Sequence, residues 1–367
     1  MLTPFNFQIG NKPAGCEDAP PIANTKWLII CDGLGGSGAT KHQIIEDGEP
    51  ITRTSGYCGS RIVACALDSC FDRLTNSGFI PNTLFGENRE QNAKFMLNML
   101  KEEIKAALQY KVNEWGIQPV RGRTLRTFPT TMSAAVIREN EDSVDAFVMW
   151  AGDSRAYFLS PSKGLQMLTQ DDAYNSDTAM LSSSEMYNCI CYGWPFFFNY
   201  AYYTFDEPGI LFCCSDGCFD YLKSPLHFDW LLMHTLTENV ELEEGKEFPQ
   251  CVAEAMMTNI YRTIGDDTTM AGVFIGIENP QDLKDAYEER LPYINEKALK
   301  MNDAIMTIRE CDQALTHLRK TKASEEEIKE VVEKSNTARA QMMEVWNEYE
   351  GNYRHLYHAT ERGATET

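Results

Sequence analysis

The chain has 367 residues, of which 43% are hydrophobic, so it is long and apolar enough for one large domain with an appendage or for two domains. Its formal net charge of −21 argues against nucleic acid or an anionic membrane as a main partner, because both are bound through clustered Lys and Arg. No apolar run approaches the roughly 18 residues that cross a bilayer, and the N-terminus shows no signal peptide, so we expect a cytoplasmic protein.

The twelve cysteines do not suggest a disulfide framework. No C-x-x-C pair occurs, and Cys31, Cys213 and Cys214 lie within apolar, strand-like runs. We therefore expect reduced, buried thiols, as in an intracellular protein.

The predicted elements before Pro280 mix strands and helices. An apolar run over residues 27–31 ends at glycines, as a buried strand does before a loop, and helical spacing follows over residues 61–74 and 92–115. Further strands are predicted over residues 130–137, 143–150, 156–159, 210–214 and 270–277. Because these runs are apolar throughout or alternate, they predict sheets that are covered on at least one face. The predicted fold class is α+β, with two sheets flanked by helices.

Residues 172–204 fit no single element. They combine Ser182-Ser183-Ser184 with the aromatic cluster Trp194-Pro195-Phe196-Phe197-Phe198. A mobile flap over a site and a buried loop both explain this composition.

Composition changes after Pro280, where the chain becomes charged and almost free of Gly and Pro. Apolar residues recur at helical spacing over residues 294–315 and again over residues 328–349, and Ser324 with Glu327 has the form of a capping box between the two runs. The pattern predicts an antiparallel helical hairpin over residues 281–358, a preceding domain over residues 1–278 and a disordered tail over residues 359–367. The hairpin either packs on its own domain or offers its apolar seam to a partner or a second copy.

Three short acidic motifs directly follow strand-like runs. They are Cys31-Asp32-Gly33-Leu34-Gly35-Gly36, Ser215-Asp216-Gly217 and Gly265-Asp266-Asp267-Thr268-Thr269. A single Asp-Gly pair is common in turns, but distant carboxylates that strand ends bring together suit a hard divalent cation. Mg²⁺ and Mn²⁺ prefer oxygen ligands and take only a few carboxylates from a protein. The set predicts a metal enzyme.

These motifs form part of a longer ordered series. Its other members are Glu17-Asp18, Thr130-Thr131, Gly152-Asp153-Ser154-Arg155 and Leu168-Thr169-Gln170-Asp171-Asp172. In this order, over residues 5–278, the series resembles the metal-dependent protein phosphatases of the type 2C class, and a bacterial member in particular. The resemblance implies a sandwich of two antiparallel β-sheets with helices on both outer faces.

The resemblance also implies a centre of two Mn²⁺ or Mg²⁺ ions at one end of the sandwich, with a third ion in some relatives. Asp32 corresponds to the ligand that bridges both ions, the carbonyl of Gly33 completes one ion, and Asp216 and Asp266 bind the other. Asp18 and Glu17 act mainly through bound water, and Asp153 corresponds to the ligand of the third ion. The family usually has Asp-Asn where this chain has Asp266-Asp267, so Asp267 is the alternative ligand if the register shifts by one.

Paired cations lower the pKa of a bridging water, so hydroxide becomes available near neutral pH to attack phosphorus in line. The expected activity is hydrolysis of phosphoserine and phosphothreonine on proteins. Asp32, Asp216 and Asp266 are the residues on which catalysis is expected to depend. Without metal, the same carboxylates would repel one another and take up protons.

The chain departs from the family where substrate phosphate is gripped. Many relatives have an arginine four residues before the first glutamate, whereas this chain has Pro13, with Lys12 beside it. Lys12 offers a point charge without the bidentate fork of an arginine, and Arg123, with the neighbouring Arg121 and Arg126, is the other candidate for phosphate binding. None of these changes removes an expected metal ligand.

Two functions from different classes remain open. The first is a metal-dependent serine/threonine protein phosphatase whose partners are a phosphorylated protein substrate and a kinase or docking protein held by the C-terminal helices. The second is a non-catalytic, phosphatase-like scaffold or sensor that acts through those helices. The missing phosphate-gripping arginine and the long hairpin favour the second function, whereas the complete set of acidic ligands favours the first.

Overall fold

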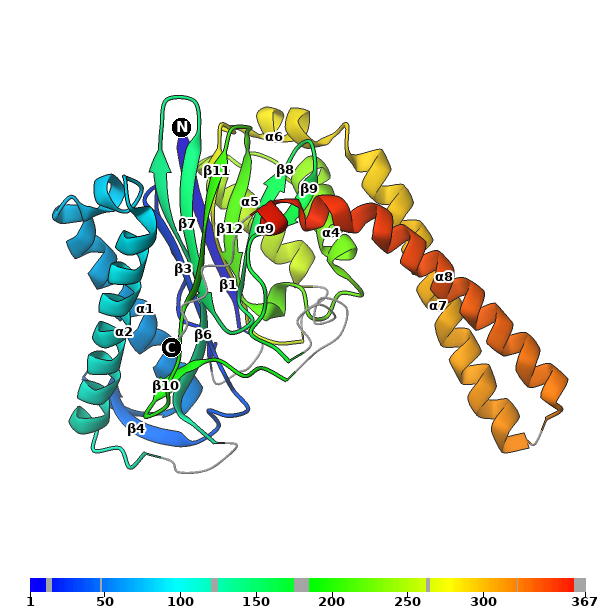
Figure 1. Ribbon diagram of the computed structural model, residues 1–367, viewed down its shortest axis with the longest axis horizontal. Helices are drawn as coiled ribbons and strands as arrows, with labels where there is room; N and C mark the ends of the chain where they lie inside the picture. The colour runs from blue at the N-terminus through cyan, green and yellow to red at the C-terminus, as the bar shows by residue number, and fades with distance from the viewer. Residues whose placement is uncertain are drawn as a thin grey trace.

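The computed structural model describes residues 1–10, 15–46, 48–119, 125–174, 185–261, 265–321 and 323–359. Its centre is a pair of antiparallel β-sheets packed face to face (Figure 1). The sheet order of the first is β1-β13-β12-β8-β9, and that of the second is β11-β7-β6-β3-β2, with β10 paired to β6. The bounds of the first sheet are β1 Leu2–Ile9, β13 Thr268–Ile275, β12 Gly209–Cys214, β8 Arg155–Ser160 and β9 Gly164–Met167.

The second sheet consists of β11 Asn199–Phe205, β7 Val144–Ala151, β6 Thr127–Glu139, β3 Trp27–Gly33, β2 Ile22–Ala23 and β10 Ile190–Tyr192. A separate two-stranded sheet joins β4 Lys41–Glu46 to β5 Glu49–Thr54. The helices are α1 Ser55–Asn76, α2 Arg89–Glu114, α4 Pro225–Glu238, α5 Phe248–Ile260, α6 Pro280–Tyr287, α7 Leu291–Thr321, α8 Glu325–Tyr353 and α9 His355–Ala359, with the short turns η1 Phe79–Thr83 and η2 Asp216–Cys218.

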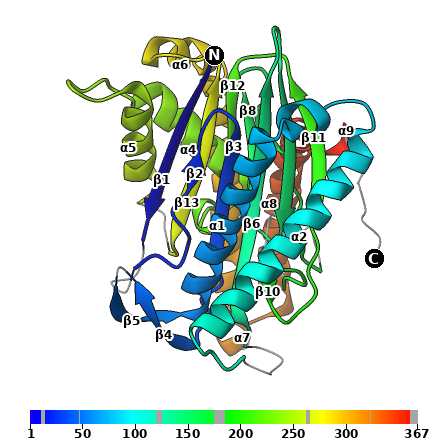
Figure 2. The same ribbon diagram turned by 90° about the vertical axis from the view of Figure 1, so that its left-hand side faces the viewer.

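Helices cover the outer face of each sheet. Helices α1 and α2 lie over the six-stranded sheet, as Figure 2 shows, and α4 and α5 lie over the five-stranded sheet. Strand β12 is buried on both of its faces. Leu211 and Cys213 point between the sheets. The alternate residues point toward α4 and are Ile210, Phe212 and Cys214. A strand that is buried on both faces needs a continuous apolar run, which is what residues 210–214 contain.

The structure confirms the predicted fold class. Each predicted strand and helix before Pro280 is present, although its bounds differ by a few residues. Strands β1, β2, β4, β5, β9, β10 and β11 were not predicted, and neither were helices α4 and α5. Strand β11 begins inside the segment 172–204, and Phe196 and Phe198 just before it pack into the core beneath α2, so this part of the segment is buried structure rather than a flap.

The C-terminal hairpin is also confirmed. Helices α7 and α8 are antiparallel and run out from the sandwich (Figure 1), and the capping box at their turn is present: Ser324 Oγ accepts the N–H of Glu327, and Glu327 Oε2 accepts the N–H of Ser324 at 2.9 Å. The half of the hairpin nearest the sheets is part of the core. Ile294, Trp346 and Tyr353 are buried there with residues of α4 and β9.

All twelve cysteines are free thiols. Within the described ranges, none of the helices combines the length and the apolar character that a membrane-spanning segment needs.

Candidate metal centre

Strand pairing brings the acidic motifs to one end of the sandwich. In the six-stranded sheet, Asp32 near the end of β3 lies opposite Thr131 of β6, and Met132 of β6 lies opposite Ala151 at the end of β7, just before Asp153. In the five-stranded sheet, Cys214 at the end of β12 lies opposite Met270 of β13, so Asp216 and Asp266 flank neighbouring strand ends. Carboxylates that are far apart in the sequence therefore meet at one end of the sandwich, where these strands end.

Asp32 lies at the centre of this group. Its carboxyl group is within hydrogen-bonding reach of the carboxyl groups of both Asp18 and Asp216. Burial, together with the charges of Asp18, Asp216 and Asp153, raises the pKa of Asp32 well above its usual range. Burial raises the pKa of Asp18 to about 6 and also raises the pKa of Asp216 strongly. Without metal, some of these carboxyl groups must therefore be protonated, because so many negative charges cannot lie this close together.

Asp153 contributes an unsatisfied carboxylate oxygen to the described part of the site. Its Oδ1 is buried and has no hydrogen-bond partner among the described residues. Burial and the charges of Asp171 and Asp220 raise the pKa of Asp153 to about 7, although Arg155 opposes the shift. A buried carboxylate oxygen without a donor costs free energy unless a cation or water binds it, so this atom fits a metal site.

The turn that carries Asp153 is held from behind. Asp172 Oδ2 accepts the N–H of Gly152 at 2.9 Å and the Nδ2 amide of Asn188 at 2.6 Å. Arg155 forms a two-pronged ion pair with Asp171, with distances of 2.7 and 2.6 Å, and donates to the hydroxyl of Tyr157 at 3.1 Å. The motif that contains Asp171 and Asp172 therefore positions the turn of Asp153.

Gly33 permits a close approach of three backbone segments. A Cβ atom at this position would lie 2.4 Å from the carbonyl oxygen of Glu17 and 2.7 Å from that of Gly56. The same end of β3 is fixed by Thr130, whose Oγ1 donates to the carbonyl oxygen of Asp32 at 2.5 Å. Only glycine fits, and it leaves the backbone carbonyl at this strand end free of side-chain hindrance.

Hydroxyl groups orient the first acidic pair. Thr269 Oγ1 donates to Asp18 Oδ2 at 2.7 Å, and Thr54 Oγ1 donates to Glu17 Oε1 at 2.7 Å. The carbonyl of Glu17 accepts Ser60 Oγ at 2.6 Å. Both acids are buried, Glu17 at 8% exposure and Asp18 at 1%, so neither is an ordinary surface charge.

The two aspartates of the last motif lie in different surroundings. Asp267 is buried, and its Oδ2 accepts the N–H of Glu17 at 2.6 Å. It also converges with Cys16 and Asp18, so that one ligand atom from each of the three lies within 4.8 Å of the others. Asp266 is exposed, accepts the N–H of Asp267 at 2.9 Å, and is close enough to Asp220 to raise the pKa of that carboxyl group. Asp266 thus faces the Asp216 side and Asp267 the Asp18 side.

Some of the acidic cluster was not predicted from the sequence. Asp220 raises the pKa of both Asp216 and Asp153, and its N–H binds the carbonyl of Asp216 at 2.9 Å across the turn η2. Its spacing of four residues after Asp216 was the available signal. Asp171 belonged to the ordered motif series but had no expected role of its own.

The candidate phosphate-binding residues Lys12 and Arg123, with Arg121, lie outside the described residues. The remaining cation of that group, Arg126, stacks on Trp194 at 4.5 Å and donates to Cys191 Sγ at 3.9 Å. Arg61, which the sequence did not single out, donates to the carbonyl oxygens of Glu17 and Cys16. Both described arginines therefore bind groups of the chain itself.

Comparison with known proteins gives one family. The model of the family described as protein phosphatase 2C matches residues 15–253. No curated protein matches the chain.

Solved structures give the same answer for the fold. A serine/threonine phosphatase PstP/Ppp of Mycobacterium tuberculosis is 16% identical, with a TM-score of 0.50 over 75% of this chain and 98% of that one. The catalytic domain of PstP in complex with two manganese ions is 17% identical, with a TM-score of 0.49 over 74% and 97%. The phosphatase Stp1 from Staphylococcus aureus is 19% identical, with a TM-score of 0.46 over 75% and 95%.

Proposed function

The chain belongs to the protein phosphatase 2C family, and we propose that it hydrolyses phosphoserine and phosphothreonine on proteins with water activated by divalent metal ions. The family makes it an enzyme of the serine/threonine protein phosphatase class. The observation that carries the metal-dependent mechanism is the convergence of Asp18, Asp32, Asp153 and Asp216 at one end of the sandwich, with Asp153 Oδ1 left without a partner among the described residues.

The acidic cluster suits two Mn²⁺ or Mg²⁺ ions, with a third near Asp153, because every candidate ligand is oxygen. Asp32 would be shared by two ions, with the carbonyl of Gly33 on one of them and Asp216 and Asp266 on the other. Glu17 and Asp18 would act through bound water, and Asp267 would support Asp18. When bound, the ions lower the pKa of a water molecule and neutralise charge on the phosphoryl oxygens.

The chain's own groups prepare the site for these ions. Thr269 and Thr54 each donate a hydrogen bond that fixes the carboxylate of Asp18 or Glu17 in one orientation. Arg155, held by Asp171, places a positive charge beside Asp153 and so favours its ionised form. These contacts reduce the reorganisation that metal binding requires.

Binding of the substrate phosphate is assigned to Lys12 and Arg123. Two described arginines near the cluster, Arg61 and Arg155, already bind the chain's own oxygen atoms, so the proposal keeps the two cations that the sequence suggested. Lys12 would act as a point charge and Arg123 as a fork.

The remaining parts of the proposal concern context. Residues 1–278 would carry the catalysis, and the hairpin over residues 281–358 would dock a partner, either a kinase or an adaptor in a signalling pathway. The twelve free thiols favour a reducing compartment such as the cytoplasm.

The test measures hydrolysis of para-nitrophenyl phosphate and of a phosphothreonine peptide, with Mn²⁺ and with chelator. Wild type is compared with Asp216→Asn and with Asp142→Asn, a matched change in the exposed turn between β6 and β7. Activity that requires Mn²⁺, disappears in Asp216→Asn and persists in Asp142→Asn is the expected result. Activity in chelator, or in Asp216→Asn, would refute the mechanism. If the protein shows no turnover and no Mn²⁺ binding by calorimetry, that result would favour a non-catalytic scaffold.

A further inference from the structure

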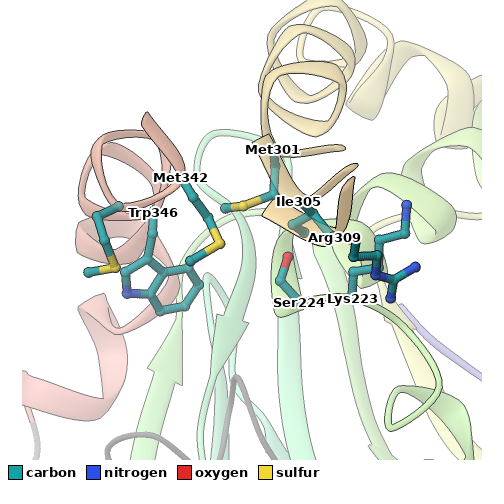
Figure 3. Close-up of a pocket in the computed structure, with 8 residues that line it drawn as sticks. Lys223, Ser224, Met301, Ile305, Arg309, Met342 and Trp346 are labelled. Carbon is teal, nitrogen blue, oxygen red and sulfur yellow. The ribbon is translucent and has the colours of Figure 1, made fainter. Parts of the chain in front are cut away.

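A pocket opens where the base of the hairpin meets the loop before α4 (Figure 3). Met301 and Ile305 of α7 and Met342 and Trp346 of α8 form its apolar part, and Lys223 and Arg309 lie at one end. It encloses about 200 Å³. This is smaller than the roughly 300–1,000 Å³ of small-molecule sites, so the pocket suits one bulky side chain better than a cofactor.

The apolar walls of the pocket combine a fixed tryptophan ring with flexible methionine side chains. The ring of Trp346 packs against Tyr349 and Tyr353, with centroid distances of 5.9 and 6.0 Å, which holds it in place. Met301 of α7 places an unbranched, polarizable side chain across from it, and Met342 lies beside it on α8, as Figure 3 shows. Methionine surfaces of this kind adapt to the shape of an apolar ligand. The pocket is therefore formed before a ligand arrives.

The charged end of the pocket is unusual for this chain. Lys223 donates to the side-chain oxygen of Asn302, and neither Lys223 nor Arg309 has a carboxylate within ion-pair distance in the described part of the chain. The whole chain carries a net charge of −21, which repels an acidic segment from most of its surface. Two cations without an acidic partner, next to an apolar pocket, favour a ligand that combines a carboxylate with a bulky apolar group.

The pocket shares a loop with the candidate metal centre. Lys223 follows Asp216 by seven positions in the loop between β12 and α4. Seven residues span at most about 25 Å, so a peptide held in the pocket can place a residue several positions away in the acidic cluster. This proximity points to the substrate itself as the occupant rather than to a separate regulator.

We propose that this pocket docks a short acidic segment of the phosphoprotein substrate, with one bulky apolar side chain between Trp346 and the methionines and a neighbouring carboxylate at Lys223 and Arg309. The proposal rests on the phosphatase function and adds a substrate feature that is recognised away from the phosphate. A second copy of the chain and the binding of an acidic peptide without an apolar anchor are alternative outcomes of the test.

Direct binding is measured first, with metal-free protein, by the fluorescence anisotropy of three fluorescein-labelled peptides. One has a phenylalanine flanked by glutamates, the second replaces that phenylalanine with alanine, and the third replaces the glutamates with lysines. We expect the first to bind most tightly and Lys223→Glu/Arg309→Glu to weaken it by about tenfold. Arg319→Glu/Lys320→Glu, the same charge change at the far end of α7, is the matched control and should bind like wild type.

Equal binding of the phenylalanine and alanine peptides would refute the apolar anchor, and equal loss in the two charge-reversed variants would refute the assigned cations. A dimer in sedimentation that the phenylalanine–glutamate peptide dissociates would instead identify a second copy of the chain as the occupant and refute substrate docking. Because this assay needs no turnover, an inactive enzyme would not affect its outcome.

Turnover then tests whether the docked segment is part of the substrate. A phosphothreonine peptide joined through a flexible linker to the phenylalanine–glutamate segment should have a lower KM than the same phosphopeptide alone. Lys223→Glu/Arg309→Glu should raise KM for the joined peptide only and leave hydrolysis of para-nitrophenyl phosphate unchanged. Equal KM values for the two peptides in wild type would refute substrate docking, whereas failure of all three substrates would refute the phosphatase function instead.

Discussion

Asp229 of α4 is a fully buried carboxyl group at the junction of the hairpin with the five-stranded sheet. Its Oδ2 accepts the hydroxyl of Tyr349 at 3.2 Å and lies 3.9 Å from Arg290, and its Oδ1 has no partner among the described residues. Tyr287 is the other titratable group that faces it. The surroundings offer the hydroxyl of Tyr349, the N–H of Leu165 and one distant cation, which together are too little to replace the hydration of a carboxylate.

Burial raises the pKa of Asp229 from its ordinary value of 3.8 to about 6, although Arg290, the N–H of Leu165 and the hydroxyl of Tyr349 oppose the shift. Because the folded state holds the proton more tightly than the unfolded state, stability is full below pH 3.8 and falls as pH rises through 6. The complete shift corresponds to about 3 kcal/mol. About 1 kcal/mol of this penalty is present at pH 4.5 and nearly all of it at pH 7.5, which leaves a change of about 2 kcal/mol.

The assay is urea unfolding of wild type and Asp229→Asn, in chelator, at pH 4.5 and pH 7.5. Asn keeps the shape of the side chain and still accepts from Tyr349, but it does not ionise. The other carboxylates titrate alike in both proteins, so the difference between the two free energies of unfolding isolates Asp229. We expect that difference to shift by about 2 kcal/mol in favour of Asp229→Asn at the higher pH. A difference that does not change with pH would refute the reasoning.

Three further predictions follow from the site. In chelator, Asp153→Asn should raise the melting temperature, because it removes a buried charge. The additional rise in melting temperature that Mn²⁺ gives to wild type should be smaller in this variant. Scanning fluorimetry measures both effects, and a lower melting temperature in chelator would contradict the prediction. Tyr353→Phe removes a donor to Tyr157 and should cost about 0.5–1.5 kcal/mol in urea unfolding, with no cost if that bond is dispensable. Gly33→Ala would place a Cβ 2.4 Å from the carbonyl of Glu17 and should lower Mn²⁺ affinity in calorimetry, whereas unchanged affinity would exclude this strand end from the site.

The parts of the fold that the sequence predicted are those where one local pattern decides the structure. Residues 210–214 are apolar throughout and form β12, and Ser324 with Glu327 caps α8. Strand β1 was not predicted, although Phe5, Phe7 and Ile9 alternate with polar residues, because the pattern is short and contains Pro4 at the sheet edge. Strands β4 and β5 form a small hairpin in which half of the residues are exposed, so periodicity carries little information there.

The site was predictable to the extent that ligands follow strands. Asp32, Asp216 and Asp153 each come directly after an apolar run, so their convergence follows from sheet topology. Roles that depend on a partner from another segment were not predictable. The ion pair of Arg155 with Asp171 joins residues 16 positions apart, and nothing in either motif specifies the other.

The contacts of the C-terminal hairpin were not predictable from the sequence either, although they join the hairpin to the acidic cluster. Apolar spacing in α8 shows that Tyr349 and Tyr353 face inward, but not what they contact. In the structure Tyr353 donates to Tyr157, which accepts from Arg155, the residue that holds Asp171 beside the turn of Asp153. The end of α8 is therefore joined to the acidic cluster by consecutive buried polar contacts. Removing the hairpin would expose the part of the five-stranded sheet around β9 and release Arg155 from one side, so an effect on metal binding follows from packing alone.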